Sequence, residues 1–423
     1  TSCMVDTCNE TAKTCTHTKI TGTDVDGDGT LDLACGGTDC DDKDPRTFAG
    51  AAERCDGRDN SCNLKIDDYA VLPRGSALVS APAGGKINGA TAWMGDKMLA
   101  FSGVGGVCGV SKPANLYAQL VDATGTAGTE KVVASGACTG FIMLAAAGSP
   151  SHALVAWESA SVRYATIVRD DASVVATVSL AGPPGGPVTT HQGSVDVAWM
   201  GSSWLVGFTR SVDGGGGAVT NYGKFGFVST TGSIDIRNVP TDDGTGILGT
   251  PGVVKTGFNA TNIATAWVDS TGPIKLAIHD LAGAKTAGPV TLPAGTPVAL
   301  AGTSKGFVLL YAAGTGTRYA FVSSAGVLGV DALAGIAVPR GGHGTFDAAR
   351  GEGAMAAESN DGVTLLYGRG DLADGLEHTT AFTPAAPSTL DSVSIDFVGG
   401  LLGVAHYSQA DGKSRGYKVG CLP

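Results

Sequence analysis

"SVDVAWMGSSWLVGFTR", residues 194–210, contains two short apolar runs separated by the turn sequence Gly-Ser-Ser. Side chains alternate with period 2 inside each run, which is typical of β-strands. The pattern continues with "KFGFV" at 224–228, the turn "STTGS" at 229–233 and "IDIRNV" at 234–239. Residues 194–239 therefore predict one antiparallel unit of four strands.

The same unit recurs along residues 70–423. Comparison of the chain with itself gives seven units, beginning near Gly89, Gly140, Gly193, Thr250, Pro297, Gly344 and Thr389. A third strand with aromatic or branched residues recurs in all of them, as in "LYAQLV" at 116–121 and "RYAFV" at 318–322. Four strands in repeats of about fifty residues are typical of propeller blades.

The ends of this region predict how the ring closes. The seventh unit has three strands, and an unmatched strand sequence, "SALVSAP" at 76–82, precedes the first unit. If this strand completes the last blade, the ring closes without exposed sheet edges. We expect an all-β protein with a seven-bladed β-propeller closed by an N-terminal strand. Six blades, eight blades and an array of two-sheet sandwiches are the alternatives.

Composition agrees with short strands and tight turns. The 423 residues include 65 Gly and 18 Pro, and only 16% are charged. Of the formal net charge of -11, residues 1–69 carry -8, from fifteen acids and seven bases. Nucleic acid is not an expected partner, because no stripe of Lys and Arg is present. A membrane span is not expected either, since the longest apolar runs, such as "FIMLAAAG" at 141–148, are too short.

Residues 23–45, "TDVDGDGTLDLACGGTDCDDKDP", concentrate the negative charge. Eight aspartates lie in this stretch, namely Asp24, Asp26, Asp28, Asp32, Asp39, Asp41, Asp42 and Asp44. Two carboxylates about 4 Å apart near a protein surface repel each other by roughly 4 kcal/mol. A folded structure here requires a cation, and an acidic solvated linker is the alternative.

The spacing matches a calcium loop. Asp24, Asp26 and Asp28 occupy loop positions 1, 3 and 5, and the remaining positions 6, 7 and 9 are Gly29, Thr30 and Asp32. The bidentate Glu of position 12 is missing, because Cys35 stands there. We expect the last oxygens to come from Asp39, Asp41, Asp42 and Asp44. No amphipathic helix flanks the loop, so the prediction is a static site and not an EF-hand switch.

Residues 53–68, "ERCDGRDNSCNLKIDD", form a second acidic cluster held by Cys55 and Cys62. Its candidate oxygen ligands are Asp56, Asp59, Asn60, Asn63, Asp67 and Asp68. The spacing is looser than in the first loop. Together the two clusters predict one to three Ca²⁺ ions.

The segments "DVDGDG", "CGGTDCDDKDP", "AGAAERCDG" and "RDNSCNLKIDD" resemble the repeated metal-binding motif of secreted bacterial proteins of the MopE type. The chain departs from that pattern at Ala49, Ser61, Asn63 and Leu64, where the family has Pro, Asp, Asp and Gly. The resemblance implies metal binding. Copper is a minor alternative, because copper favours imidazole or thioether ligands and the segment offers carboxylates. The turns in "AWMGDKMLAF" and "AWMGSSWLVGF" loosely resemble myxobacterial surface and lipoprotein propellers.

Ten cysteines indicate an oxidising compartment. Seven lie in the first seventy residues, and the propeller region holds Cys108, Cys138 and Cys421. Both counts are odd, so a bridge must join the two regions if every cysteine pairs within the chain. We expect it to run from Cys421 to one of the first seven cysteines, with Cys3, Cys8 and Cys15 favoured, and we expect a Cys108–Cys138 bridge. A free or intermolecular thiol is the alternative.

These features predict three parts: a small Cys-rich segment at 1–22, an acidic calcium-binding module at 23–69 and the propeller at 70–423. The chain starts at Thr1 without a Met or signal-like segment, so we expect a processed or trimmed form.

No catalytic motif is found, and the seven His show no ligand spacing. A hydrolase or lyase acting on polysaccharide would need clustered Asp, Glu, Arg or His at the inner-strand ends, where the sequence has mostly Ala, Val and Gly. A lectin would need accessible Trp, but the five Trp recur with the repeat, which favours packing between blades. We expect a non-enzymatic protein, secreted or on the outer surface of a Gram-negative bacterium, that serves binding, adhesion or assembly, including filaments. The expected partner is a surface protein, a glycan or copies of the chain itself.

Overall fold

The computed structural model describes residues 4–19, 24–51, 58–63, 78–82, 88–104, 114–136, 145–159, 162–180, 195–213, 219–240, 247–248, 252–314, 316–347, 351–359, 362–369, 372, 377–382, 392–398, 401–408 and 412–419. The chain forms two compact units, Pro73–Lys418 on the one hand and Thr1–Leu72 with Val419–Pro423 on the other. The larger unit is the propeller.

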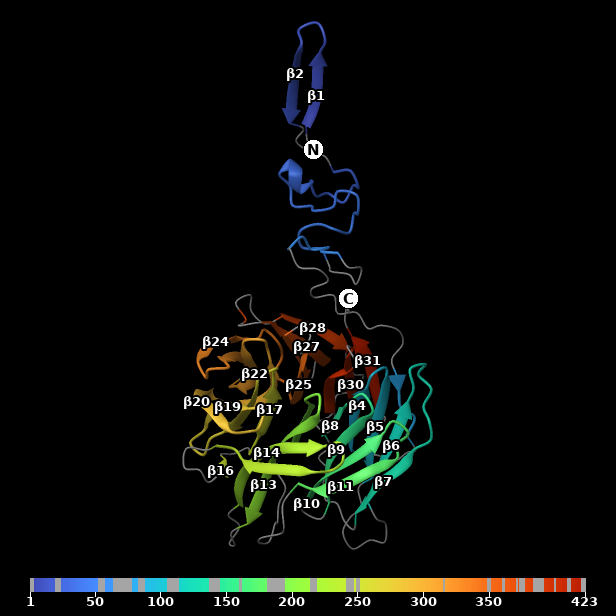
Figure 1. Ribbon diagram of the computed structural model, residues 1–423, viewed down its shortest axis with the longest axis vertical. Helices are drawn as coiled ribbons and strands as arrows, with labels where there is room; N and C mark the ends of the chain where they lie inside the picture. The colour runs from blue at the N-terminus through green and yellow to red at the C-terminus, as the bar shows by residue number, and fades with distance from the viewer. Residues whose placement is uncertain are drawn as a thin grey trace. The chain divides into compact units, whose positions relative to one another are not determined.

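Seven antiparallel sheets make up the described part of the larger unit, and Figure 1 shows them arranged in a ring. Their inner strands are β4 (Asn88–Met94), β8 (Ala145–Gly148), β12 (Val195–Trp199), β17 (Val254–Phe258), β21 (Thr296–Gly302), β25 (Gly341–Asp347) and β29 (Ser392–Val398). The second strands are β5 (Lys97–Val104), β9 (His152–Ser159), β13 (Ser203–Asp213), β18 (Asn262–Val268), β22 (Gly306–Ala313), β26 (Glu352–Ser359) and β30 (Leu401–Ser408). Each predicted unit start lies within five residues of the start of an inner strand.

The outer half of each blade follows the same order along the chain. The third strands are β6 (Ala114–Val121), β10 (Val162–Arg169), β14 (Val219–Ser229), β19 (Pro273–Asp280), β23 (Gly316–Ser323), β27 (Gly362–Arg369) and β31 (Lys413–Val419). The outer strands are β7 (Lys131–Gly136), β11 (Val174–Ser179), β15 (Ile234–Asn238), β20 (Lys285–Ala294), β24 (Leu328–Leu333), β28 (Glu377–Phe382) and β3 (Leu78–Val79). A short strand, β16 (Ile247–Leu248), also pairs with β14. The seven-bladed prediction is confirmed.

Strand β3 closes the ring, as the sequence predicts. It pairs with β31 through Leu78 opposite Gly416, and the N–H of Ser80 donates to the carbonyl of Ser414 at 2.9 Å. The inner strands contact one another in sequence around the ring, and β29 of the last blade contacts β4 of the first. The last blade is therefore built from both ends of the propeller region.

Small residues let the inner strands approach closely. A Cβ on Gly148 would lie 1.5 Å from the carbonyl oxygen of Trp93 in the neighbouring blade, and a Cβ on Gly344 would lie 2.2 Å from that of Leu300. Larger side chains cannot occupy these positions without moving a backbone. The high Gly and Ala content of the inner strands follows from this packing.

Four of the five tryptophans are buried, namely Trp93, Trp157, Trp204 and Trp267. The fifth, Trp199, is half-buried, with its ring centroid 4.9 Å from that of Trp204. The expected packing role is confirmed for the four buried side chains, which are not accessible for stacking on a sugar.

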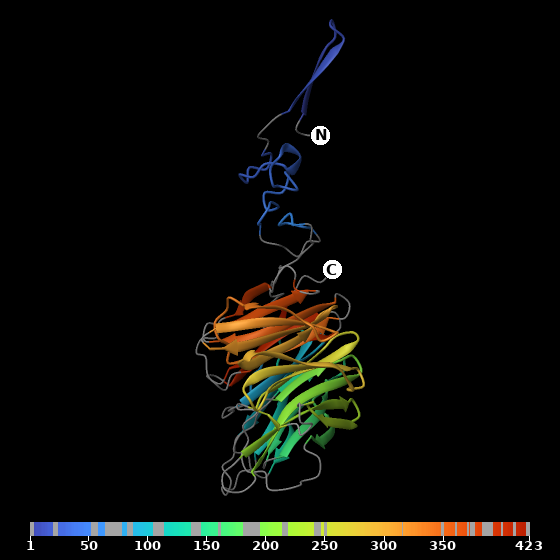
Figure 2. The same ribbon diagram turned by 90° about the vertical axis from the view of Figure 1, so that its left-hand side faces the viewer.

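The smaller unit begins with the hairpin of β1 (Met4–Asn9) and β2 (Thr14–Lys19), seen in Figures 1 and 2. Cys8 and Cys15 are paired across the two strands and joined by a disulfide. One 3₁₀ turn, η1 (Leu33–Cys35), follows in the acidic segment.

Polar residues take the place of an apolar core in this unit. Among its described residues, Cys35 is the only hydrophobic residue that is buried, whereas Asp39, Thr47 and Asn60 are buried as well. A unit of this kind has little hydrophobic stabilisation and needs covalent or ionic links. In the described part of the chain, no helix is long and apolar enough to cross a bilayer.

Candidate metal centre

The first acidic loop winds around Asp24. Its carboxylate accepts hydrogen bonds from the N–H groups of Gly27 at 2.7 Å, Asp28 at 3.2 Å and Gly29 at 2.9 Å. Gly27 and Gly29 have φ values of 80° and 94°, in the left-handed region that favours glycine. The sharp turn expected at Gly29 is present, and it brings the loop aspartates together.

Three carboxylates in this region share one arrangement. In Asp26, Asp28 and Asp39, Oδ1 accepts a backbone N–H from two residues further on, at 3.2, 2.6 and 2.8 Å. The Oδ2 atoms of the same three residues are buried and have no hydrogen-bond partner among the described residues. Burying an unpaired polar atom costs about 1–3 kcal/mol, and more when it is charged. Three such oxygens in one small region indicate that a cation belongs there.

The carboxylates form two groups of metal-binding size. One contains Asp24, Asp26 and Asp28, and the other contains Asp26, Asp39 and Asp42, with the ligand atoms of each group within 4.8 Å of one another. Asp42 Oδ1 also accepts the N–H of Val25 at 2.8 Å, which ties the first loop to the segment that follows η1. All donors are hard oxygens, the ligands that hard divalent cations prefer.

The pKa values of two of these carboxyls indicate that the cluster favours a nearby positive charge. Loss of solvent raises the pKa of the Asp26 carboxyl and that of the Asp39 carboxyl above their ordinary value. The backbone N–H groups that they accept oppose the rise, and repulsion from neighbouring carboxylates adds to it. A cation bound among these oxygens would favour the charged forms and lower both pKa values. The residues present therefore fit a divalent metal ion, which would neutralise the cluster.

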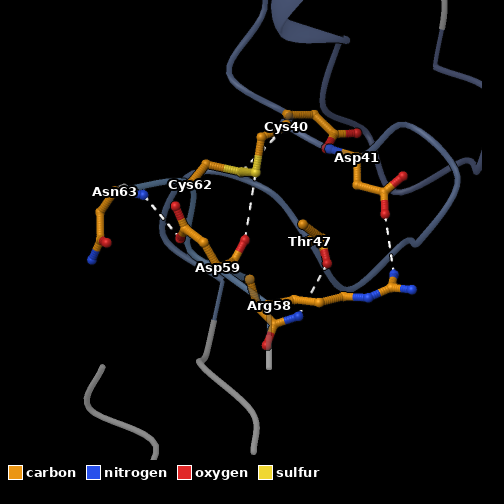
Figure 3. The surroundings of a disulfide bond; sticks show 9 residues. Cys40, Asp41, Thr47, Arg58, Asp59, Cys62 and Asn63 are labelled. Carbon is orange, nitrogen blue, oxygen red and sulfur yellow. Dashed lines mark hydrogen bonds and ion pairs between the residues drawn. A yellow bond between two sulfur atoms is a disulfide. The ribbon is translucent and has the colours of Figure 1, made fainter. Parts of the chain in front are cut away.

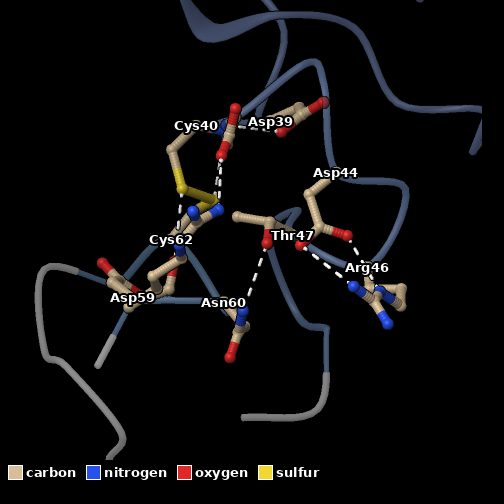
Figure 4. A network of polar contacts seen from close by, with 10 residues as sticks. Asp39, Cys40, Asp44, Arg46, Thr47, Asp59, Asn60 and Cys62 are labelled. Carbon is tan, nitrogen blue, oxygen red and sulfur yellow. Dashed lines mark hydrogen bonds and ion pairs between the residues drawn. A yellow bond between two sulfur atoms is a disulfide. The ribbon is translucent and has the colours of Figure 1, made fainter. Parts of the chain in front are cut away.

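The other predicted ligands of the first loop have contacts of their own. Asp41 forms an ion pair with Arg58 at 3.2 Å, and Asp44 forms one with Arg46 at 2.9 Å, as Figures 3 and 4 show. Asp32 forms a parallel β-bridge with Asp39. The half-buried Thr30 donates its N–H to Asp28. The groups above contain neither Asp41 nor Asp44, whose charge is met by arginine.

The second predicted cluster is described only in part. Asp59 Oδ1 accepts the N–H of Asn63 at 3.1 Å (Figure 3). The buried Asn60 donates from Nδ2 to Thr47 Oγ1 at 3.2 Å (Figure 4). The remaining candidates, Asp56, Asp67 and Asp68, lie outside the described residues.

The disulfides correct part of the cysteine prediction. Cys62 pairs with Cys40, so this bridge joins the two acidic clusters and does not hold the second one alone (Figure 3). Cys8 and Cys15 pair with each other, so the prediction that either of them pairs with Cys421 is wrong. Cys8 and Cys15 face each other on the β1–β2 hairpin, so they pair locally. An odd count of cysteines does not show which residues are close in space. The predicted Cys3–Cys421 and Cys108–Cys138 bridges, and Cys55, lie outside the described residues.

The propeller holds a group of ionisable residues that the sequence did not reveal. Asp196, Lys255, His343 and Asp396 all lie on inner strands, and all four are buried. Lys255 Nζ lies 3.7 Å from Asp196 Oδ1, and His343 Nε2 lies 4.0 Å from the same atom. The prediction of mostly Ala, Val and Gly at the inner-strand ends misses this group, because each of its residues comes from a different repeat. Only the ring topology brings them together.

These side chains form hydrogen bonds with backbone groups of other inner strands. Asp196 Oδ2 accepts the N–H of Thr256 at 3.0 Å, and Lys255 Nζ donates to the carbonyl of Gly342 at 2.8 Å. His343 contacts the carbonyls of Ile395 and Val197, which belong to different blades. These contacts link blades across the ring and give the group a structural role.

Asp396 makes the stability of the propeller depend on pH. Burial raises the pKa of this carboxyl from 3.8 to about 6, against the lowering effects of His343 and of the backbone N–H groups of Trp93 and Gly148. Because the folded pKa lies above the unfolded one, the stability contributed by protonated Asp396 is full below 3.8 and is lost as the pH rises through about 6. Two pKa units correspond to about 3 kcal/mol.

We therefore expect the free energy of unfolding of the wild-type chain to fall by about 3 kcal/mol through Asp396 as the pH rises from 4 to 7. Asp396→Asn should lack this fall. Denaturant unfolding of the variant and of the wild-type chain at several pH values measures the difference. Burial lowers the pKa of His279 to about 4, which acts in the opposite direction. His279 is present in both proteins, so its effect cancels in the comparison. Parallel pH profiles of the two proteins would contradict the assignment to Asp396.

Comparison with known proteins gives a family match that covers Asp39 and Asp42 of the second group. Residues 39–68 match the MopE-type copper-binding family model, which is described as "Putative metal-binding motif". No curated protein sequence matches the chain.

Several solved structures are similar at low identity. The fucose-specific lectin of Aleuria aurantia is 9% identical, with 75% of this chain and 99% of the lectin covered and a TM-score of 0.43. The propeller domain of the trilobed protease of Pyrococcus furiosus is 8% identical, with coverages of 81% and 96% and a TM-score of 0.41. The acylaminoacyl peptidase of Pyrococcus horikoshii is 7% identical with a TM-score of 0.42; the match covers 82% of this chain but only 52% of the peptidase.

None of these likenesses assigns an activity. The site and the family match together show that this chain carries a MopE-type metal-binding motif, at residues 39–68, ahead of a seven-bladed β-propeller.

Proposed function

We propose that the chain is a non-enzymatic secreted or cell-surface protein, in which Ca²⁺ makes the N-terminal module rigid and the propeller serves binding, adhesion or extracellular assembly. The observation that carries the proposal is the set of buried Oδ2 atoms of Asp26, Asp28 and Asp39. They have no hydrogen-bond partner among the described residues, which in this unit bury little apolar surface. An ion bound among these oxygens would stabilise the folded unit in place of a hydrophobic core, so folding of the unit would depend on metal binding.

Calcium suits the ligands better than other metals. The two groups of the described residues contain aspartates only, without His or Cys. Copper favours imidazole and thioether donors, whereas Ca²⁺ takes six to eight oxygens. The first loop lacks the bidentate Glu of position 12, which favours weak binding, with Kd on the order of 10⁻⁴–10⁻³ M as in extracellular modules. Such a site fills outside the cell, where disulfides such as Cys40–Cys62 also persist.

The proposed partner of the propeller is another surface protein, a glycan or a second copy of this chain. A polysaccharide hydrolase or lyase is the second candidate, because acidic and basic side chains meet on the inner strands, namely Asp196, Lys255, His343 and Asp396. The hydrogen bonds of these residues to backbone groups favour a structural role for them, which agrees with the non-enzymatic proposal. An assay for polysaccharide cleavage with wild-type protein and Asp396→Asn separates the two. Cleavage that the substitution abolishes would favour the enzyme.

Cell fractionation tests the location and the role. Intact cells that express the native chain are treated with protease, and the propeller is detected with an antibody in the surface, secreted and cytosolic fractions. We expect the chain on the surface or in the secreted fraction, and imaging of that fraction shows whether it forms filaments. A chain found only in the cytosol, with reduced cysteines, would overturn the proposal.

A further inference from the structure

Asp26 belongs to both groups of carboxylates. It lies with Asp24 and Asp28 in the first group and with Asp39 and Asp42 in the second. The ligand atoms of each group lie within 4.8 Å of one another. Ca²⁺ binds oxygens at about 2.3–2.6 Å, so the oxygens around one ion lie at most about 5 Å apart. Each group therefore has the size of the shell around one ion.

The two groups are separate in this geometry, and only Asp26 belongs to both. Among the described residues, no group of metal-binding size contains Asp28 together with Asp39. Both residues have a buried Oδ2 without a hydrogen-bond partner, and Asp39 is 0% exposed. A single ion in the first group would not be held by Asp39, and a single ion in the second would not be held by Asp28. Either arrangement leaves one buried Oδ2 without a partner.

The second group also connects parts of the module that are distant in sequence. Asp42 accepts the N–H of Val25 from the first loop, and Asp39 forms a β-bridge with Asp32. The adjacent Cys40 is joined to Cys62. An ion in the second group would hold the first loop against the disulfide-linked segment.

We propose that the module binds two Ca²⁺ ions that share the Asp26 carboxylate, one held with Asp24 and Asp28 and the other with Asp39 and Asp42. This inference rests on the proposed function for the identity of the ion. The shared carboxylate couples the two sites, because its position is fixed by whichever ion binds first.

Counting ions in single and double variants tests the proposal. The full chain is titrated with Ca²⁺ by calorimetry, and bound ions are counted by native mass spectrometry. We expect Asp28→Asn and Asp42→Asn each to lose one ion relative to wild type, with affinity at least about tenfold lower at the altered site. The double variant should lose two ions, and Asp26→Asn should also lose two. Asp122→Asn, in a propeller turn, is the control and should lose none.

The outcomes separate this inference from the proposed function. Counting losses relative to wild type keeps the result independent of any ion bound elsewhere. If the double variant loses the same single ion as each single variant, the two groups form one site and the inference is wrong. If wild-type protein binds no Ca²⁺, the proposed function itself fails. Mapping of the Cys8–Cys15 and Cys40–Cys62 disulfides shows that each variant carries the same cysteine pairing as the wild-type chain.

Discussion

Removing divalent cations should make residues 24–63 sensitive to protease while the propeller stays resistant. Without an ion, the carboxylates of the two groups repel each other, by roughly 4 kcal/mol for a pair about 4 Å apart near the surface. Among the described residues of the unit, Cys35 is the only buried hydrophobic residue, which leaves little apolar burial to oppose that repulsion. The propeller has a large core of buried residues in every blade and contains neither group.

Limited proteolysis with and without a chelator, followed by mass spectrometry of the fragments, measures this effect. Adding Ca²⁺ back should restore resistance, and Asp26→Asn should behave like the chelated wild-type protein. The matched control Asp122→Asn should respond as wild type does. Equal cleavage of the acidic segment before and after chelation would show that its fold does not depend on metal.

Replacing Trp93 by Ala should destabilise the propeller by about 3–5 kcal/mol, as expected for a fully buried aromatic side chain. Trp93 lies where the first blade meets the last. A Cβ added to Gly403 would lie 2.3 Å from its ring, and one added to Gly416 would lie 2.7 Å from it. Leu78 of the closing strand packs in the same cluster. The substitution therefore leaves a cavity at the closure of the ring.

Denaturant unfolding followed by near-ultraviolet circular dichroism measures the loss. Trp199→Ala is the matched control, because Trp199 is only half-buried and should cost less. Gly403→Val should also destabilise the propeller, since its side chain would collide with Trp93. A change below about 1 kcal/mol for Trp93→Ala would contradict the packing described at this interface.

The sequence predicts the propeller well because its signal is periodic. Each blade repeats the strand-turn pattern of residues 194–239. The seventh unit has three strands of its own, so the unmatched strand sequence at 76–82 can only complete that blade. The Asp24, Asp26 and Asp28 group is equally local, since alternate residues of one loop form it.

Other features depend on contacts between distant residues. The pairing of Cys40 with Cys62 and of Asp41 with Arg58 requires the path of the chain between the clusters, which no local spacing specifies. The contact of His343 with Asp196 joins different blades of the propeller. Sequence separation hides such pairs even when the fold class is correct.

The central claim is that the acidic module folds around hard divalent cations. Elemental analysis of the purified full chain, together with hydrogen exchange of residues 24–63, tests it most directly. The account predicts one to three Ca²⁺ ions per chain and protection of that segment that disappears on chelation. A chain with no calcium, whether it contains copper or no metal, and with the segment still protected at neutral pH would contradict it.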